Sequence, residues 1–475
     1  MRHYLYLLLL ALLSSCTVGP DYHVPASQLP AHYSSSHPTL SANKLPGKTS
    51  FWYRHFNDPV LVSLIEKAVD GSNFDIQKSL ANIREARAEI AIVNADNLPE
   101  LDGVGKISRD RLSGNSEILS SFPSNKIPLS YTDYRFGFDA SWEIDVFGHT
   151  RRSVEAARAR FQSATENLNN TAIIVAAEVA RTYTQYRVYQ QRVIIAAHTI
   201  DAYTETTRLV KLEMQAGSAS AVDLHRAESE LLSAKAALPP LQASAKSSLA
   251  ALAILTGELP EKLFARLEKI EPIPILKPDA LSVGLPADLL HRRPDLRIAE
   301  RELAAATADL GVAVANQFPR FQLIGDLGSE TTKPGTYFQR ASAFWSVGPQ
   351  FSIPIFQGGR LKNAVKAQAA ANDAAIANYR KAIIQALADV ESSMVQYHQD
   401  RIKNKKLLGS YNKLKSVRRL IQLQYKEGQA SLLDVLDVER QLDTLNNEYV
   451  QSLGQVTIDL VALYKAFGGA WGQVD

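Results

Sequence analysis

The chain has 475 residues, of which 46% are hydrophobic and 21% charged, and its formal net charge at pH 7 is +3. The hydrophobic content supports a large core, and the near balance of charges gives no electrostatic bias toward nucleic acid. A single cysteine, Cys16, excludes internal disulfides and thiolate metal sites.

Residues 1–15 have the layout of a secretory signal peptide. Arg2 and His3 give a basic start, and residues 5–13 form an apolar run. That run is too short to span a bilayer, because a membrane-spanning helix needs ~20 residues. No later segment is apolar over 18 consecutive residues, so any crossing of a membrane by the mature chain requires β-strands.

The stretch "LSSC" at residues 13–16 predicts a lipid on Cys16. It matches a lipobox, in which the thiol is the nucleophile that takes a diacylglycerol and the cysteine becomes the N-terminus. We expect Cys16 to carry this S-diacylglycerol group and an N-acyl chain, because two or more acyl chains anchor a protein stably. An ordinary signal peptide with an incidental cysteine is the alternative. Residues 16–56 are predicted to be an acylated, extended segment.

The remainder of the chain is an internal duplication. Glycines, aspartates and a proline coincide when the sequence is shifted by 211 residues, and earlier in each half by 220: Gly217 with Gly428, Asp223 with Asp434, Pro99 with Pro319 and Gly105 with Gly325. Repeat one is therefore placed at 57–267 and repeat two at 287–475. Four prolines between 268 and 286 disfavour a helix there and predict an extended linker.

Each repeat predicts a helix, two strands and a long helical hairpin. The strands lie at about 100–147 and about 319–356, where side chains alternate with period two. One face is polar or charged. The other is apolar: Tyr134, Phe136, Phe138, Ala140, Trp142, Ile144 and Val146 in repeat one, and Trp345, Val347, Phe351, Ile353 and Ile355 in repeat two.

Two proline-free segments predict very long helices. Residues 151–216 would measure ~100 Å as one helix at 1.5 Å per residue, and residues 361–427 would be similar. Such lengths suggest coiled-coil contacts between many helices. Pro239 and Pro240 interrupt the returning helix of repeat one and predict a kink there.

Glycines mark the tips of the two hairpins. Gly217 and Gly428 predict tight turns. Asp223 and Asp434 follow in the first turns of the returning helices, where a carboxylate is favourable.

The alternating strands fit either a soluble, half-buried sheet or a transmembrane β-barrel. The signal peptide, the lipid anchor and the charged inner face favour a barrel with a watery lumen. Four strands cannot close one, since the smallest barrels have about eight. Several copies must therefore assemble.

The motifs resemble the TolC-like outer-membrane factors, especially the OprM/NodT lipoprotein branch, over nearly the whole chain. They include "CTVGPDYHVP" from Cys16, "WEIDVFGHTRRSVEAARA" from Trp142 and "GPQFSIPIFQGGRLKNAV" from Gly348. The resemblance implies a mainly α fold with a β-barrel, built as a homotrimer. A twelve-stranded outer-membrane barrel, four strands from each chain, would continue as a twelve-helix periplasmic α-barrel.

The resemblance also implies a function and partners. The protein would be the exit duct of a tripartite efflux system that exports drugs or other small molecules across the outer membrane of a Gram-negative bacterium. It would be lipid-anchored there and extend into the periplasm. A periplasmic membrane-fusion adaptor and an inner-membrane pump would dock on it, with a pump of the resistance-nodulation-division type as the first expectation. The residues identify neither the cargo nor the particular pump.

A periplasmic gate is expected at the tip of the second hairpin. By resemblance, Leu433, Asp437 and Arg440 match constricting positions of OprM-like proteins, and Asp434 and Asp437 match paired aspartates at the TolC entrance. Three-fold symmetry would gather these carboxylates into a ring able to bind cations and to have raised pKa values. The alternative makes Asp434 a helix N-terminal charge and Arg440 a solvated residue. Ala430 stands where TolC has a latching arginine, so that latch is not expected.

The tips themselves are predicted to meet the adaptor. Gly217, Asp223 and Gly428 lie there, although tight turns alone would also explain the glycines. Asp437 and Arg440 are three residues apart on a helix, so they can pair within one chain.

The sequence predicts no catalytic site, no metal site and no cofactor besides the lipid on Cys16. The ten histidines are scattered, and HExxH, GxSxG and phosphate-binding glycine motifs are absent. Two other functions remain open. One is a duct for type I protein secretion, which has the same architecture. The other is a periplasmic coiled-coil lipoprotein scaffold without a pore, against which the alternating strand pairs argue.

Overall fold

The computed structural model describes residues 17–26, 29–34, 52–113, 129–275 and 286–469. The chain forms two compact units, and each takes segments from both sequence repeats. The sheet unit comprises the described residues within 1–25, 83–163 and 299–379, and the hairpin unit comprises the rest.

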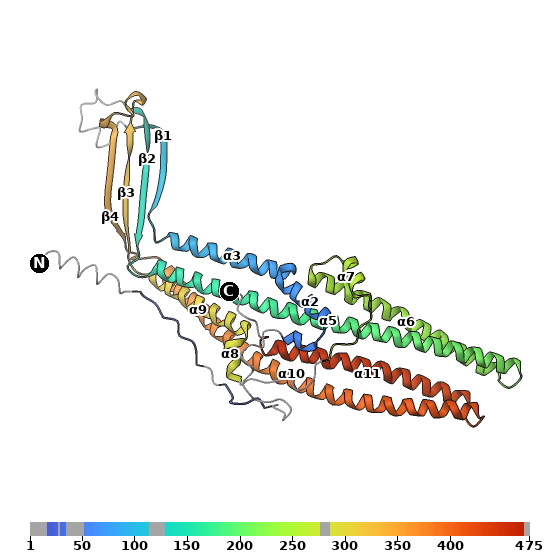
Figure 1. The fold of residues 1–475 in the computed structure, drawn as a ribbon. Helices are drawn as coiled ribbons and strands as arrows, with labels where there is room; N and C mark the ends of the chain where they lie inside the picture. The colour runs from blue at the N-terminus through green and yellow to red at the C-terminus, as the bar shows by residue number, and fades with distance from the viewer. Residues whose placement is uncertain (1–16, 27–28, 35–51, 114–128, 276–285, 470–475) are drawn as a thin grey trace. The chain divides into compact units, whose positions relative to one another are not determined.

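Four strands make one antiparallel sheet in the order β1-β2-β3-β4. They are β1 (Glu100–Arg111), β2 (Ser130–Ile144), β3 (Arg320–Thr331) and β4 (Ala343–Ser352), and Figure 1 shows them side by side. The pairing of β2 with β3 joins the two repeats, with Gly137 opposite Gly328. β1 and β4 are left as edges, each with one side unpaired in the described chain.

The register places most of the apolar side chains of the four strands on one face. Phe138 lies between Gly103 and Leu327, and Leu327 is opposite Trp345. This face is not covered by the chain itself, since Trp345 is 77% and Phe136 56% exposed. Uncovered aromatic and aliphatic side chains over a whole sheet face indicate contact with another molecule or with lipid.

The opposite face of the sheet is polar and is cross-linked. Arg135 on β2 forms an ion pair with Asp326 on β3 at 3.0 Å, and its guanidinium lies 4.6 Å from the centre of the Phe344 ring on β4. Ser346 donates a hydrogen bond to the same Asp326. The two faces thus differ in chemistry as the period-two alternation predicts.

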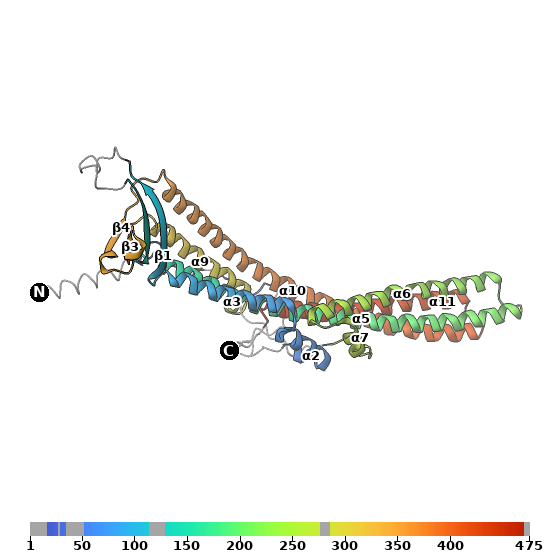
Figure 2. The same cartoon turned by 90° about the horizontal axis from the view of Figure 1, so that it is seen from above.

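Long helices make up most of the remaining structure: α3 (Phe74–Ala95), α5 (His149–Gln215), α6 (Ala221–Thr256), α9 (Pro294–Ala315), α10 (Arg360–Lys426) and α11 (Leu432–Ala466). α5 and α6 form one hairpin, α10 and α11 the other, and Figure 2 shows the limbs of each side by side. None of the described helices combines the length and the apolar character needed to cross a membrane.

Shorter elements accompany them: η1 (Trp52–Phe56), α2 (Pro59–Lys67), η2 (Ala68–Ser72), α7 (Pro260–Leu267), η4 (Pro286–Asp288), α8 (Leu289–Arg292), η5 (Pro334–Thr336) and η6 (Arg340–Ser342). One expectation needs correction. Residues 52–56 form a 3-10 helix instead of an extended chain, and Trp52, Tyr53 and Phe56 are all buried in it. α6 is one helix that includes Pro239 and Pro240, so the two prolines do not end it.

A buried cation organises the core of the hairpin unit. Arg187 on α5 is 1% exposed and donates to the Tyr183 hydroxyl at 3.0 Å and to the Lys269 carbonyl at 2.8 Å. Tyr183 in turn donates to Asp58, the N-cap of α2, at 2.9 Å. Because a buried charge is costly without partners, this chain of bonds fixes α2 and the start of the linker on α5.

The Gly137–Gly328 contact in the sheet should not tolerate a side chain. A Cβ on Gly137 would lie 2.4 Å from the Leu327 carbonyl oxygen, so Gly137→Ala should lower the free energy of unfolding by ~1–3 kcal/mol. Gly348→Ala on β4 is the matched control, since its Cβ would meet nothing within 4 Å. Urea unfolding of the detergent-solubilised protein measures both. Equal losses for the two variants would contradict the close approach of β2 and β3 at Gly137.

Candidate gate at the hairpin tips

Both hairpins turn at a glycine in the left-handed region. Gly217 has φ +78° and Gly428 has φ +71°. An added Cβ would meet nothing within 4 Å at either position, so the backbone conformation, not space, requires glycine. The amide of the following residue reaches back to close each helix end, Ser218 to the Glu213 carbonyl and Gln429 to the Gln424 carbonyl, both at 2.8 Å.

The helix after each turn begins with a capping box. In α6 the Ser220 hydroxyl accepts from the Asp223 amide at 3.2 Å, and Asp223 accepts from the Ser220 amide at 3.1 Å. Ser431 and Asp434 repeat this arrangement in α11, at 3.3 and 2.9 Å. The spacing Ser-x-x-Asp is a sequence signature of a helix start. This spacing could have identified both serines from the sequence, although neither was predicted.

The capping box determines the ionisation of Asp434 in the single chain. Hydrogen bonds from the Ser431 hydroxyl and then from the Ser431 amide lower the pKa of the Asp434 carboxyl below its usual value. The raised pKa expected for a carboxylate ring is therefore absent in one chain. Asp434 acts here as the helix N-terminal charge that was the alternative interpretation.

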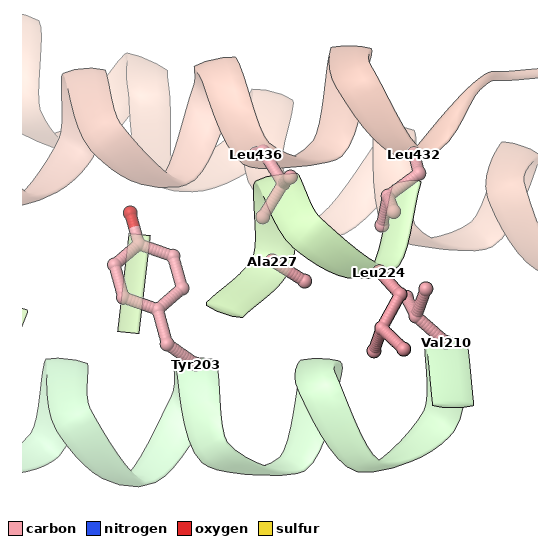
Figure 3. Close-up of a cluster of buried hydrophobic side chains, with 6 residues drawn as sticks. All are labelled: Tyr203, Val210, Leu224, Ala227, Leu432 and Leu436. Atoms are coloured by element: carbon pink, nitrogen blue, oxygen red, sulfur yellow. The ribbon is translucent and has the colours of Figure 1, made fainter. Parts of the chain in front are cut away.

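A hydrophobic cluster joins the two hairpins close to their tips (Figure 3). Its six buried members come from three helices: Tyr203 and Val210 on α5, Leu224 and Ala227 on α6, and Leu432 and Leu436 on α11. Tyr425 on α10 packs against the cluster and donates to Glu213 on α5 at 2.8 Å. Burial, followed by the bond to Glu213, raises the pKa of Tyr425 to about 12. The first turns of α11 are thus held against hairpin one.

The predicted gate residues lie on a different face of α11 from Leu432 and Leu436. Leu433, Asp437 and Arg440 follow the i, i+4, i+7 spacing of one helix face. Leu433 is 56% exposed, and Asp437 accepts from Arg440 at 2.7 Å and from Gln441 at 2.6 Å. The bond from Arg440 lowers the pKa of Asp437. This exposed face, Leu433–Asp437–Arg440, is named the α11 stripe.

The structure therefore separates the predicted site residues into three groups. The α11 stripe forms one continuous surface, whereas Asp434 serves the helix cap. Gly217 and Asp223 belong to the other hairpin's turn and cap. Among the described residues, no cluster of His, Cys, Asp or Glu could hold a metal ion.

Cys16 lies outside the described residues, but the segment that follows it is fixed. The Val18 amide donates to the Phe147 carbonyl at 3.1 Å. Arg152 on α5 is buried and donates to the Val18 carbonyl at 3.4 Å and to Asp21 at 2.6 Å. Residues 17–22 are named the N-terminal strap. Its anchor, Arg152, was not predicted, because no local pattern marks an arginine whose partners in the strap lie 131 and more residues away.

Residues 65–258 and 285–469 match the model of the family described as outer membrane efflux protein. The chain belongs to this family. It is 30% identical over 466 residues to nodulation protein T of Rhizobium leguminosarum bv. viciae, covering 97% of this chain and 92% of that protein. It is also 30% identical over 473 residues to the toluene efflux pump outer membrane protein TtgI of Pseudomonas putida, with 97% of both chains covered.

Solved structures of outer-membrane channels share the fold. The outer-membrane channel OprN superposes with a TM-score of 0.87 at 30% identity, covering 96% of this chain and 100% of that one. The open state of the MtrE outer membrane channel of Neisseria gonorrhoeae gives 0.83 at 26% identity, covering 96% and 99%. The predicted fold class, outer-membrane location and efflux-channel function are thereby confirmed.

The two faces of the first turns of α11 predict opposite results on truncation. Leu432→Ala empties a buried position and should lower stability by ~2–5 kcal/mol. Leu433→Ala, one residue along, removes an exposed side chain and should change stability by no more than ~0.5 kcal/mol. Limited proteolysis of the tip and thermal unfolding report both. If Leu433→Ala lost as much stability as Leu432→Ala, the assignment of Leu432 to the buried face and Leu433 to the exposed face of α11 would be wrong.

Proposed function

We propose that three copies of this efflux-family chain form the exit duct of a tripartite efflux system. A periplasmic adaptor and an inner-membrane pump, first of the resistance-nodulation-division type, would feed drugs or other small molecules into it. Efflux relatives carry names such as toluene efflux pump and antibiotic efflux pump outer membrane protein. These names favour small organic molecules as the class of cargo.

The sheet supplies the observation that carries this proposal. Its apolar face is exposed, its polar face is paired internally, and both of its edges are open. In hydrocarbon an unpaired strand edge is not tolerated, and four strands are too few to close. Pairing β4 of one copy with β1 of the next leaves no open edge and supplies enough strands to close a barrel. The exposed apolar face of the sheet then becomes the outer surface of that barrel, in contact with lipid. Three copies give the twelve strands that the family resemblance implies.

The α11 stripe is our proposed periplasmic gate. Three copies around the duct axis would present Leu433 as an apolar constriction, with Asp437 and Arg440 beside it. Asp434 lies within electrostatic reach of Asp437 and would add to the negative potential at the entrance. The turns at Gly217 and Gly428, with Asp223, form the end of the hairpins that we assign to the adaptor.

Cys16 is our proposed lipid-anchor site. The N-terminal strap begins at the next residue and is bonded to the junction between β2 and α5. An acylated Cys16 would therefore enter the membrane beside the barrel, where the inner leaflet of the outer membrane lies.

Removing the Asp437 carboxylate should loosen the gate. Asp437→Ala is expected to raise single-channel conductance in a planar bilayer, because the bond that holds Arg440 at 2.7 Å is lost. Glu205→Ala is the matched control. Glu205 forms another solvent-exposed i,i+3 pair, with Arg208 at 2.6 Å on α5, outside the stripe. If both variants conduct alike, the gate does not lie at the α11 stripe.

Replacing Cys16 tests the anchor separately from the duct. Cys16→Ser should remove the mass of the attached lipid from the intact protein, as read by mass spectrometry, while channels still form in bilayers. The reason is that the strands close into a barrel by pairing with one another, which does not require the acyl chains. A lipid mass that persists in Cys16→Ser would contradict the assignment.

A further inference from the structure

A cavity of ≈ 450 Å³ lies within the sheet unit, between the end of α3, the start of α5, α9 and the N-terminal strap. Its floor is apolar and its rim is polar. The floor is made by Val154, Ala159 and Ala304, which are 6–7% exposed. Tyr22 of the strap lines one side and donates from its hydroxyl to Glu300 at 3.1 Å.

The rim of this cavity carries more cations than anions. Three arginines line it, Arg151, Arg158 and Arg301, against one carboxylate, Glu155. Most of these charged groups already have partners. Arg151 forms an ion pair with Asp145 at 3.3 Å, and Glu155 forms one with Arg152 at 2.8 Å. Arg301 pairs with Glu300 and also donates to Gln162 at 3.1 Å.

Arg158, unlike the other charged residues of the rim, has no such partner in the described chain. It is exposed and makes no ion pair with any residue that the structure describes. The amides of Asn94, Asn97 and Gln162 complete the rim as neutral donors. An arginine presents five N–H donors in a fixed fork that fits a phosphate with two parallel bonds. The uncompensated charge of the cavity thus has the chemistry of an anion site.

Two observations favour a position of the cavity at the depth of lipid headgroups. Trp142, on the apolar face of β2, donates from its indole nitrogen to the Asn97 carbonyl at 3.0 Å, and Asn97 lines the cavity. Tryptophan with an apolar body and a bonded N–H is typical of the membrane–water interface. The strap that lines the other side begins directly after Cys16.

We propose that this cavity binds the phosphate of an anionic phospholipid headgroup. This inference rests on the proposed function, because it requires the sheet to be a membrane barrel and the strap to be its anchored flank. Arg158 holds the phosphate, with the spare N–H groups of Arg301 beside it, and the small floor residues accept the glycerol carbons. A cavity of this size holds a headgroup and leaves the acyl chains in the leaflet.

Native mass spectrometry of delipidated protein in a neutral detergent tests the inference. The probes are dimyristoyl phosphatidylglycerol, dimyristoyl phosphatidylcholine and soluble glycerol phosphate. The wild type should retain phosphatidylglycerol in preference to phosphatidylcholine. Arg158→Gln should weaken phosphatidylglycerol binding about tenfold, the usual effect of losing a bond to a charged group. The phosphatidylglycerol affinity of Arg158→Lys should lie between those of the wild type and Arg158→Gln.

Arg360→Gln is the matched control for Arg158→Gln. Arg360 starts α10 in the same unit, donates to Gln357 at 3.2 Å and does not line the cavity. Its loss should leave lipid binding unchanged. Phosphatidylglycerol binding that is equal in Arg158→Gln and wild type, or equal to phosphatidylcholine binding, would overturn the proposal. Glycerol phosphate binding as tightly as phosphatidylglycerol would overturn the lipid source in favour of a soluble phosphate ester.

Conductance of the same preparations separates the two levels of inference. Preparations that form channels but show no lipid selectivity would contradict the headgroup site and leave the proposed duct supported. Preparations that form no channels would instead contradict the proposed function, and with it the headgroup site that depends on it.

Discussion

The satisfaction of backbone hydrogen bonds at the two edges of the sheet is the constraint on which the rest of the molecule depends. β1 and β4 each present an unpaired row of amides and carbonyls, and the apolar face beside them is exposed. In water such edges invite aggregation, and in lipid they are excluded. Only other copies of the chain, continuing the sheet in the same antiparallel sense, remove both problems. Assembly is therefore a condition of folding in the membrane and not a later addition to a finished monomer.

The hairpin tips are built on a division of roles around a single helix. Leu432 and Leu436 hold the start of α11 against α5 and α6, while Leu433 in the α11 stripe is exposed, as the proposed gate requires. The capping box at Ser431 fixes where the helix begins and therefore which residues face which way. A shift of one residue would exchange Leu432 for Leu433, and so the cap and the cluster together define the proposed gate.

Local patterns predicted much of this structure. Period two gave the two faces of the strands, and proline-free, alanine-rich segments gave the long helices, because both depend on residues close in sequence. Contacts distant in sequence were missed. Arg152 binds the strap, Trp52 and Phe56 fold into a 3-10 helix by burial, and the compact units cut across the repeats. Asp434 considered alone fits a gate and a helix cap equally, and Ser431, three residues earlier in the sequence, identifies the cap.

The central claim is that the open sheet is closed by identical copies. The number of chains in the folded, detergent-solubilised protein tests it most directly, measured by light scattering with the detergent contribution subtracted. We predict three chains, and unfolding of the sheet should dissociate them. A single chain that keeps its sheet folded in detergent would contradict the claim, because its edges would then be stable without partners.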